Sequence, residues 1–450
     1  MTNMTGYGAT HATVMTGSDR ARFAAAEAAL QPAPGRFPGV LGVLTGMYLA
    51  SVAMMSAAGE GLSWVPQVIG LTLGVGWIVI GVMFKGQPLR WSAPVLLYVL
   101  FALWCGTGLS VTINTPYFMT LFKTILKVAL VTWVASQCTR TRNDFLVCCL
   151  LLCIAGFVIV ATGIDTITRA IAQSSKDAGN AARASGTLIN NSNNFGIFGV
   201  IVIIGAVACL MGYRNVLLKS VGVTAIACGL YIVAASGSRK AMAGVALSAL
   251  ALYFYHFRKA GSGGFGKKVL VTFLTLVMFA GTAYYLSRLP FLHRFTEVVT
   301  SSHQAQKEAR YQYFFKALES TAQHPLIGLG IGGFSMHRLG RNASGEGQYS
   351  HSSISETLSC TGIPGFLLYY GSQFALYKLI RRVRRLRIPR SDWTMVNLIF
   401  VLYWVQLAFG AAAVIYDHRL LYPLIGAICG YLWNLQRDYA DTAYATVPAR

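Results

Sequence analysis

A histidine and two widely separated arginines carry the chemistry that this sequence offers. His351 stands in the run YSHSSISE, Arg239 in AASGSRKAMAG and Arg310 in EARYQYFF. A neutral imidazole can accept a proton near pH 7, and a guanidinium group binds phosphate oxygens through two parallel hydrogen bonds. Each residue alone also has a plain structural explanation: a lone histidine beside an apolar run is more often a cap, and an arginine there can extend to the membrane surface.

Four further basic residues could contact the same phosphate-bearing ligand as the two arginines. Lys123 and Lys127 lie four residues apart, on one face of an expected helix that contains no acidic residue. Lys240 follows Arg239, and Arg183 begins the run RASGTLINNSNNFGIF. We expect Arg183, Lys123, Lys127 and Lys240 to bind substrate; the alternative for the lysine pair is that both side chains extend to the membrane surface.

Membrane-spanning helices must position these residues. Of the 450 residues, 55% are hydrophobic and 12% are charged, whereas about a quarter of the residues in soluble domains are charged. Apolar runs of about twenty residues, long enough to cross roughly 30 Å of hydrocarbon, recur along the chain. We predict an all-α polytopic membrane protein with about twelve transmembrane helices, at residues 38–57, 63–84, 92–112, 118–137, 145–162, 193–212, 217–235, 241–256, 269–286, 361–379, 393–415 and 419–436.

The basic residues decide the predicted orientation. With a cytoplasmic N-terminus, most of the 37 Lys and Arg residues fall in short cytoplasmic segments, as the positive-inside rule requires. The long polar stretch at residues 287–360 is then external, which in a Gram-negative cell means periplasmic, and a loop of this length can hold folded, water-facing chemistry. The expected division is a cytoplasmic tail at 1–37, nine transmembrane helices in 38–286, a periplasmic loop at 287–360, three transmembrane helices in 361–436 and a cytoplasmic tail at 437–450.

Composition also argues against several other classes of protein. Six of the nine cysteines lie inside apolar runs and are expected to behave as small hydrophobic residues, namely Cys148, Cys149, Cys153, Cys209, Cys228 and Cys429. No Cys/His spacing is typical of a zinc or iron site, so we expect no metal and no other cofactor. The net charge of +22 follows from membrane topology, and no nucleic-acid partner is expected.

The long loop itself contains a predicted helix. The segment AQKEARYQYFFKALESTAQ has an amphipathic pattern that ends before Pro325, with Ser301 and Gln304 as a capping pair at its start. This helix would carry Arg310 and would place its apolar side chains on the mouth of the bundle, namely Ala309, Phe314, Phe315, Ala317 and Leu318. His324, His337 and His418 match no motif and are predicted to be structural.

A glycine cluster follows that helix. Gly328, Gly330 and Gly333 fit the spacing G-x-G-x-x-G of a dinucleotide-binding loop. That loop must follow a strand and begin a helix, whereas these glycines follow a predicted helix. We therefore predict turn glycines rather than a nucleotide site.

Four signals in order, over about residues 180–370, resemble the O-antigen ligase and Wzy-type polymerase superfamily. They are RASGTLINNSNNFGIF, SGSRK, an arginine followed by aromatics and then HPLIGLGIGGF, and H-S-x3-E-x5-G-I-P-G with His351, Ser352 and Glu356. The family pattern most often has His-Asn where this chain has His351 and Ser352, and a second acidic residue where Cys360 stands. The N-terminal third is similar in hydropathy alone.

The resemblance implies a metal-independent, inverting glycosyltransferase with a GT-C-type bundle in the bacterial inner membrane. The donor would be a glycan on undecaprenyl diphosphate, and the acceptor hydroxyl would belong to a second lipid-linked glycan or to lipid A-core. It implies His351 as the base, Glu356 as the residue that orients it, and Arg239 with Arg310 as the diphosphate clamp. Membrane lipid and a chain-length regulator are the other expected partners.

Three alternatives remain open at this point. Ligases of this superfamily tend to have H-[NSQ]-x9-G-x-x-T, and Gly365 stands here in place of the Thr, which favours a polymerase over a ligase. A transporter of anionic lipid-linked saccharide would use the outer cations differently, but no repeat relates the two halves of the chain. A SEDS-type peptidoglycan polymerase would rely on an acidic residue in the outer loop.

Overall fold

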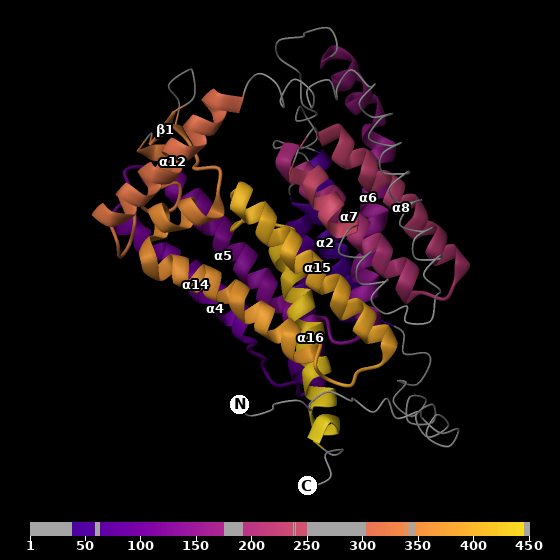
Figure 1. Cartoon of the computed structure of the whole chain (residues 1–450). Coiled ribbons are helices and arrows are strands. Elements are labelled where there is room, and N and C mark those ends of the chain that lie inside the picture. Colours follow the sequence, from indigo (N-terminus) through magenta and orange to yellow (C-terminus); the bar gives the residue numbers. More distant parts are fainter. Residues whose placement is uncertain are drawn as a thin grey trace, which may run out of the picture.

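A computed structural model describes residues 38–58, 64–174, 192–236, 238, 240–249, 303–337, 339–341 and 347–444. Long helices dominate it (Figure 1). The first group comprises α2 (Val40–Ala58), α3 (Val65–Gly76) continued by a π-helical segment (Trp77–Phe84), α4 (Ala93–Cys105), α5 (Thr115–Cys138) and α6 (Arg142–Ser174). The second comprises α7 (Ser192–Gly212), α8 (Val216–Ser236), α12 (His303–Gln323), α13 (Gly333–Met336), α14 (Ser353–Val383), α15 (Arg390–Ala412) and α16 (Leu421–Tyr444).

The predicted all-α membrane architecture is confirmed, although the number of spans is not. Seven of the described helices are long and apolar enough to cross a bilayer: Val65–Phe84, Ala93–Ser110, Thr115–Cys138, Arg142–Gly163, Asn194–Gly212, Val216–Ser236 and Arg390–Ala412. Shorter apolar helices are Val40–Met55 and Lys240–Ala249. The predicted spans 361–379 and 419–436 fall within α14 and α16, which are not among the seven, and 269–286 lies outside the described residues. A total of about twelve spans therefore stays a prediction.

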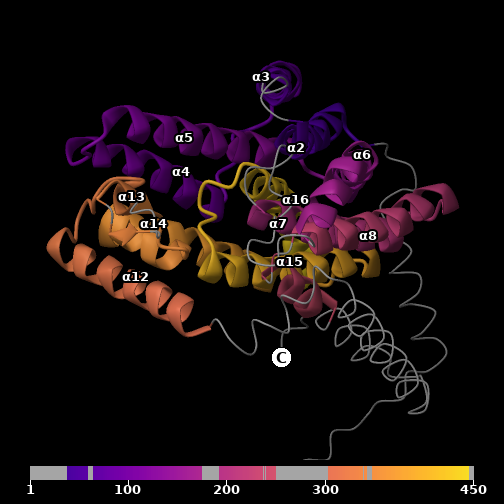
Figure 2. The ribbon, with the colours of Figure 1, turned by 90° about the horizontal axis from the view of Figure 1, so that it is seen from above.

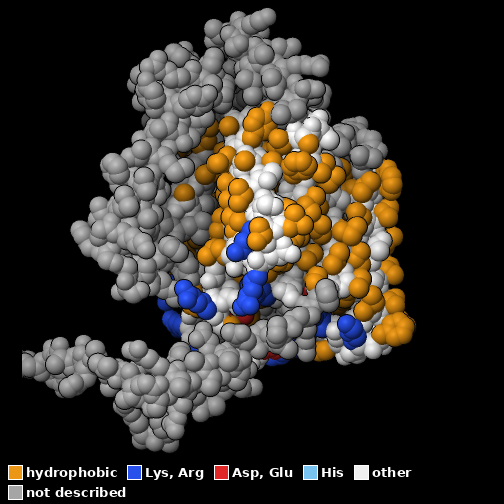
Figure 3. All heavy atoms as spheres, turned by 90° about the vertical axis from the view of Figure 1, so that its right-hand side faces the viewer, with side chains coloured by type: hydrophobic (Ala, Val, Ile, Leu, Met, Phe, Trp, Pro, Cys, Tyr) orange, Lys and Arg blue, Asp and Glu red, His pale blue; other side chains and the backbone are white. Residues whose placement is uncertain are grey.

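The helices fall into two groups on either side of a central pair. Helices α4, α5, α12 and α14 lie on one side, α6, α7 and α8 on the other, and α15 with α16 between them (Figures 1 and 2). Figure 3 shows apolar side chains covering much of one described face, with basic side chains gathered towards its lower end. That division is typical of a protein whose middle contacts lipid.

Helix α5 connects the two ends of the bundle. The side chain of Asn114 accepts a hydrogen bond from the Tyr117 amide (3.1 Å) and caps the helix, which has a proline in its first turn. Its 24 residues span roughly 36 Å. Gly426 and Gly430, four residues apart on α16, pack against the backbone of α5 at Thr132 and Ser136, because small residues let two helix backbones approach closely.

The end of the bundle that contains α12 and α13 is organised around a break in α14. At Gly362 the backbone has φ 67°, and the Ile363 amide donates to the Pro325 carbonyl (2.8 Å). The Leu329 amide likewise donates to the Ser359 carbonyl (2.9 Å). The loop after α12 therefore fits into the break. Two-residue strands β1 (Gly340–Arg341) and β2 (Gly347–Gln348) pair antiparallel beyond it.

The prediction of turn glycines is confirmed for Gly328 and Gly330 in this loop, but not for Gly333. Gly328 and Gly330 have φ of 70° and 78°, as does the neighbouring Gly332 at 76°, so each needs the freedom of a residue without a side chain. Gly333 begins α13. All nine cysteines are buried and free, as small hydrophobic residues should be.

The predicted apolar face of α12 is partly wrong. The helix itself is confirmed at His303–Gln323, and Ala317 is buried. Phe314, Phe315 and Leu318 are instead exposed, with 39%, 47% and 38% of their surface accessible. The buried stripe follows the helical period through Tyr313, Ala317, Ser320 and Thr321, so small polar residues pack inward where larger apolar ones were expected. The side chain of Ala309 and the whole of Ser301 lie outside the described part.

Candidate active site

His351 occupies a strained turn at the start of α14. Its φ is 63°, and among the described residues it is the one non-glycine residue with positive φ. Such a conformation costs of order 1–3 kcal/mol and persists where surrounding contacts enforce it. The imidazole is half-buried and lies beside two tyrosine rings, Tyr349 at 4.5 Å and Tyr313 of α12 at 6.2 Å between ring centroids. The turn and α12 together therefore fix the position of the ring.

Glu356 stabilises this turn through a hydrogen bond to its backbone. The predicted loop extended to residue 360, but α14 already begins at Ser353, so Glu356 lies in its first helical turn. The buried carboxylate accepts a hydrogen bond from the Ser350 amide (2.8 Å) and one from the Cys360 thiol (3.5 Å). Burial raises the pKa of Glu356, while the bonds from Ser350 act in the opposite direction. Glu356 thus fixes the backbone residue that immediately precedes His351.

Serine side chains complete the turn. Ser352 caps α14 by accepting from the Ile354 amide (3.2 Å). Ser355 donates to the Ser350 hydroxyl (2.9 Å), and Ser350 donates to the Ser352 carbonyl (3.1 Å). This hydroxyl network explains why Ser at position 352 is compatible with the site, since its oxygen serves as a helix cap.

The loop between α15 and α16 lies against the same turn. The Ser353 hydroxyl donates to the Ala413 carbonyl (2.8 Å) and accepts from the Ile415 amide (2.9 Å). This places Asp417 close enough to Glu356 for its charge to raise the pKa of Glu356, and burial raises the pKa of Asp417 itself. Sequence reasoning missed Asp417. The available signal was an acidic residue in a short loop between two apolar runs, in the sequence YDHR.

His418 is structural, as predicted. Its Nδ1 accepts hydrogen bonds from the Leu420 and Leu421 amides (3.4 and 3.2 Å) at the start of α16. Burial lowers the pKa of His418 to about 4, so the imidazole is neutral at pH 7 and can accept those bonds.

Ser238 and Lys240, the residues on either side of Arg239, lie at the same end of the bundle. Arg239 itself is outside the described residues, but its neighbours are not: the Ser238 hydroxyl accepts from the Ala241 amide (3.4 Å) and begins a helix there. In that helix, a Cβ on Gly244 would lie 3.0 Å from the ring of Phe409 on α15. A Cβ on the residue after Phe409, Gly410, would lie 3.8 Å from the Ser353 hydroxyl. Helix α15 thus connects this helix to the start of α14.

The remaining predicted site residues are less closely placed. Lys123 and Lys127 are exposed on α5, and no described carboxylate forms an ion pair with either. Lys240 is half-buried beside the Arg239 turn. Arg310 belongs to α12, although its side chain is outside the described part, as is the whole of Arg183.

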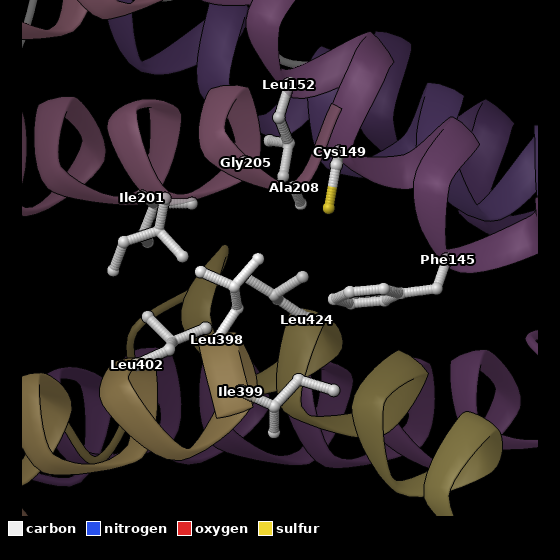
Figure 4. A pocket seen from close by; sticks show the side chains of 11 residues that line it. Phe145, Cys149, Leu152, Ile201, Gly205, Ala208, Leu398, Ile399, Leu402 and Leu424 are labelled. Atoms are coloured by element: carbon white, nitrogen blue, oxygen red, sulfur yellow. The ribbon is translucent and has the colours of Figure 1, made fainter. Parts of the chain in front are cut away.

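A cavity between the helices elsewhere in the described bundle offers no such chemistry. Only apolar side chains from α6, α7, α15 and α16 line it (Figure 4). They are Phe145, Cys149, Leu152, Ile201, Ile204, Ala208, Leu398, Ile399, Leu402 and Leu424, together with Gly205. A diphosphate would find no donor there, so we place the candidate site at His351.

Comparison with family models matches residues 223–370 to a family described as O-antigen ligase. The matched segment begins within α8 and ends within α14, and it contains Arg239, Arg310, His351 and Glu356. A comparison with curated proteins finds no match.

Proposed function

We propose, from the match of residues 223–370 to the O-antigen ligase family, that the chain transfers a glycan from undecaprenyl diphosphate to a sugar hydroxyl. The active site would face the periplasm from the inner membrane, and the reaction would be inverting and independent of a metal ion. The observation that carries the proposal is the His351 turn, a strained backbone held by a buried carboxylate and flanked by two tyrosine rings.

His351 acts as the base in this proposal. The acceptor oxygen forms a bond to the anomeric carbon from the face opposite the diphosphate, and its proton passes to the imidazole. The bond from that carbon to the phosphate oxygen breaks, and its electron pair leaves with the diphosphate. A half-buried imidazole can reach a bound hydroxyl while staying in contact with water, which suits a base that must release its proton afterwards.

Arg310 and Arg239 neutralise the leaving diphosphate. Arg310 precedes Tyr313 by three residues on α12, and residues three apart lie on the same helical face. Tyr313 contacts the His351 ring, so the helix that meets the imidazole also carries this arginine. The packing of Gly244 against Phe409 of α15, and of Ser238 against Gly196 of α7, supports the same role for Arg239. Preorganised guanidinium groups stabilise charge that develops on phosphate oxygens.

Glu356 is a positioning residue in this scheme. Its carboxylate accepts a hydrogen bond from the Ser350 amide, and so maintains the strained backbone that positions His351. Lys123, Lys127, Lys240 and Arg183 are proposed as contacts to the donor headgroup or glycan. The exposed lysine pair on α5 is available to such an anion.

Among the two family activities, we favour polymerisation of lipid-linked repeats over ligation to lipid A-core. Gly365 stands where ligases tend to have Thr, and it lies against Thr361 and the Trp104 ring, so that a larger side chain would collide with both. The local packing of α14 is therefore built for glycine at this position.

A deletion strain separates the two activities by gel analysis of its surface polysaccharide. Lipopolysaccharide that carries a single repeat is expected for a polymerase, whereas lipid-linked polymer together with bare core would assign the ligase. Purified protein should also move saccharide between lipid diphosphates in detergent. The enzyme proposal would be refuted if the deletion strain kept its normal surface polysaccharide and the purified protein transferred no saccharide.

A further inference from the structure

A group of guanidinium side chains lies at the end of the bundle opposite His351. Helix α5 runs roughly 36 Å from Thr115, and Arg140 lies two residues beyond its end at Cys138. Arg90 precedes α4, and Arg437 lies towards the C-terminal end of α16. Figure 1 shows that this end of α16 is far from α12. These three arginines therefore mark the second polar boundary of the spanning helices.

Arg90 is held rigidly in this group. It is only 8% exposed, and its backbone amide and carbonyl both bond the side-chain amide of Gln137 (3.0 and 2.7 Å). Its Nη1 donates to Asn434 Oδ1 (2.8 Å), and its guanidinium carbon lies 4.8 Å from the centre of the Trp433 ring. The guanidinium carbon of Arg437 lies 5.5 Å from the same ring, so a single indole connects the two cations.

The described carboxylates near the group are already engaged. Among the described residues, Asp438 pairs with Arg437 alone, and the Asp144 carboxylate is occupied by the backbone amides of Gly39, Arg140 and Thr141. Arg90 Nε and Arg140 Nη2 are buried and have no hydrogen-bond partner. Buried donors without partners are costly, more so on charged groups.

Electrostatics agree with this deficit. Burial, together with the neighbouring Arg140 and Arg437 charges, lowers the pKa of Arg90 to about 10, although the Asp438 charge acts in the opposite direction. A bound anion would supply acceptors to both free donors and would offset the repulsion among three like charges.

We propose that Arg90, Arg140 and Arg437 form a binding site for a phosphate anion, the phosphate being that of an anionic phospholipid headgroup. Guanidinium groups bind phosphate bidentately, and the site lies at headgroup depth, between the spans Val65–Phe84 and Ala93–Ser110.

The neighbours of Arg90 indicate a lipid rather than a soluble ion. Leu89 and Trp91, on either side of Arg90, are 55% and 47% exposed. Trp91 stacks on Trp133, with ring centroids 5.1 Å apart, and tryptophan is typical of the membrane interface. A phospholipid would cover these apolar groups with its chains while its phosphate met the arginines. The site does not depend on the enzyme proposal, because it lies at the other end of the bundle.

The test compares melting temperatures of the purified full chain in neutral detergent with added phosphatidylglycerol, phosphatidylcholine or inorganic phosphate. Phosphatidylglycerol should raise the melting temperature more than phosphatidylcholine does. Each arginine removed should lower the affinity for phosphatidylglycerol about fivefold, as expected for one basic residue at an anionic surface. The rise in melting temperature should then need correspondingly more lipid. Arg437→Gln changes an exposed side chain, and the double variant Arg140→Gln/Arg437→Gln extends the series.

The matched control is Arg385→Gln/Arg387→Gln, which removes two exposed charges from the turn between α14 and α15. It should respond to phosphatidylglycerol like the wild type. An equal response in wild type, site variants and control would overturn the proposal. Stabilisation by inorganic phosphate that is lost in the site variants would sustain the phosphate site and assign the soluble ion as its ligand.

Discussion

The two ends of the bundle handle buried charge in opposite ways. At the His351 end, Glu356 is buried and Asp417 half-buried, and backbone amides donate hydrogen bonds to both carboxylates. At the Arg90 end, guanidinium groups are buried among amide side chains and an indole, with donors left unpaired. The first arrangement fixes a turn and leaves the imidazole half-buried. The second leaves a positive site open to an anion. A satisfied network thus positions a functional group, whereas an unsatisfied one indicates a missing ligand.

The largest expected effect is at the His351 end. His351→Ala should lower glycan transfer about 10²- to 10⁴-fold, because the acceptor loses its base. The melting temperature should stay close to that of the wild type, since the ring is half-buried and the turn is held by Glu356. Transfer between lipid-linked substrates in detergent measures the loss. His324→Ala, at an exposed histidine after α12, is the control, and full activity of the His351 variant would contradict the proposed chemistry.

The break in α14 should be the next most sensitive feature. Gly362→Ala places a Cβ against the Leu326 carbonyl and requires alanine at φ 67°. Unfavourable φ and overpacking together should cost about 3 kcal/mol of unfolding free energy. Thermal unfolding measures this cost. Gly371→Ala on the same helix meets only Leu97 at 3.7 Å and should be nearly neutral; equal effects of the two substitutions would argue against the packing described for the break.

The His418 cap predicts a pH dependence of stability. Its folded-state pKa is lowered to about 4 from 6.5, so between these values the unfolded chain binds more protons than the folded one. Stability should therefore fall as pH drops, by about 2 kcal/mol between pH 7 and pH 5 from this group. His418→Asn keeps an acceptor for the helix amides and removes the titration. Melting temperatures across this range should fall less steeply in the variant, and an unchanged slope would exclude His418 as the source.

Glu356 should show a smaller effect. Glu356→Gln keeps an oxygen for the Ser350 amide but loses a charge-assisted hydrogen bond, so kcat should fall about tenfold, at unchanged KM, if the carboxylate positions His351. The pKa of Glu356 is raised, so the folded state binds more protons than the unfolded one above the ordinary glutamate pKa, and this group lowers stability as pH rises. The variant should lose that contribution. Melting temperatures of the variant and the wild type are compared from pH 5 to pH 7. Their difference separates the contribution of Glu356 from that of His418.

Much of the secondary structure could be predicted from local pattern. Apolar runs gave the positions of α4 to α8 and α15, and the amphipathic segment before Pro325 gave α12, because helix formation depends on contacts three or four residues apart. The inward face of α12 could not be found this way. Ser320 and Thr321 are buried and Phe315 is exposed, since what matters is the surface that α12 packs against.

The sequence by itself determined which residues could do acid–base and phosphate chemistry, and it placed His351 and Glu356 in one short motif. Tertiary structure alone decided that Glu356 grips the backbone before His351, that Asp417 joins the same site, and that Arg90 lies beside Trp433. Those contacts connect residues as far as 344 positions apart, as in the bond from Arg90 to Asn434. Such contacts depend on how helices pack together, and no local periodicity specifies that packing.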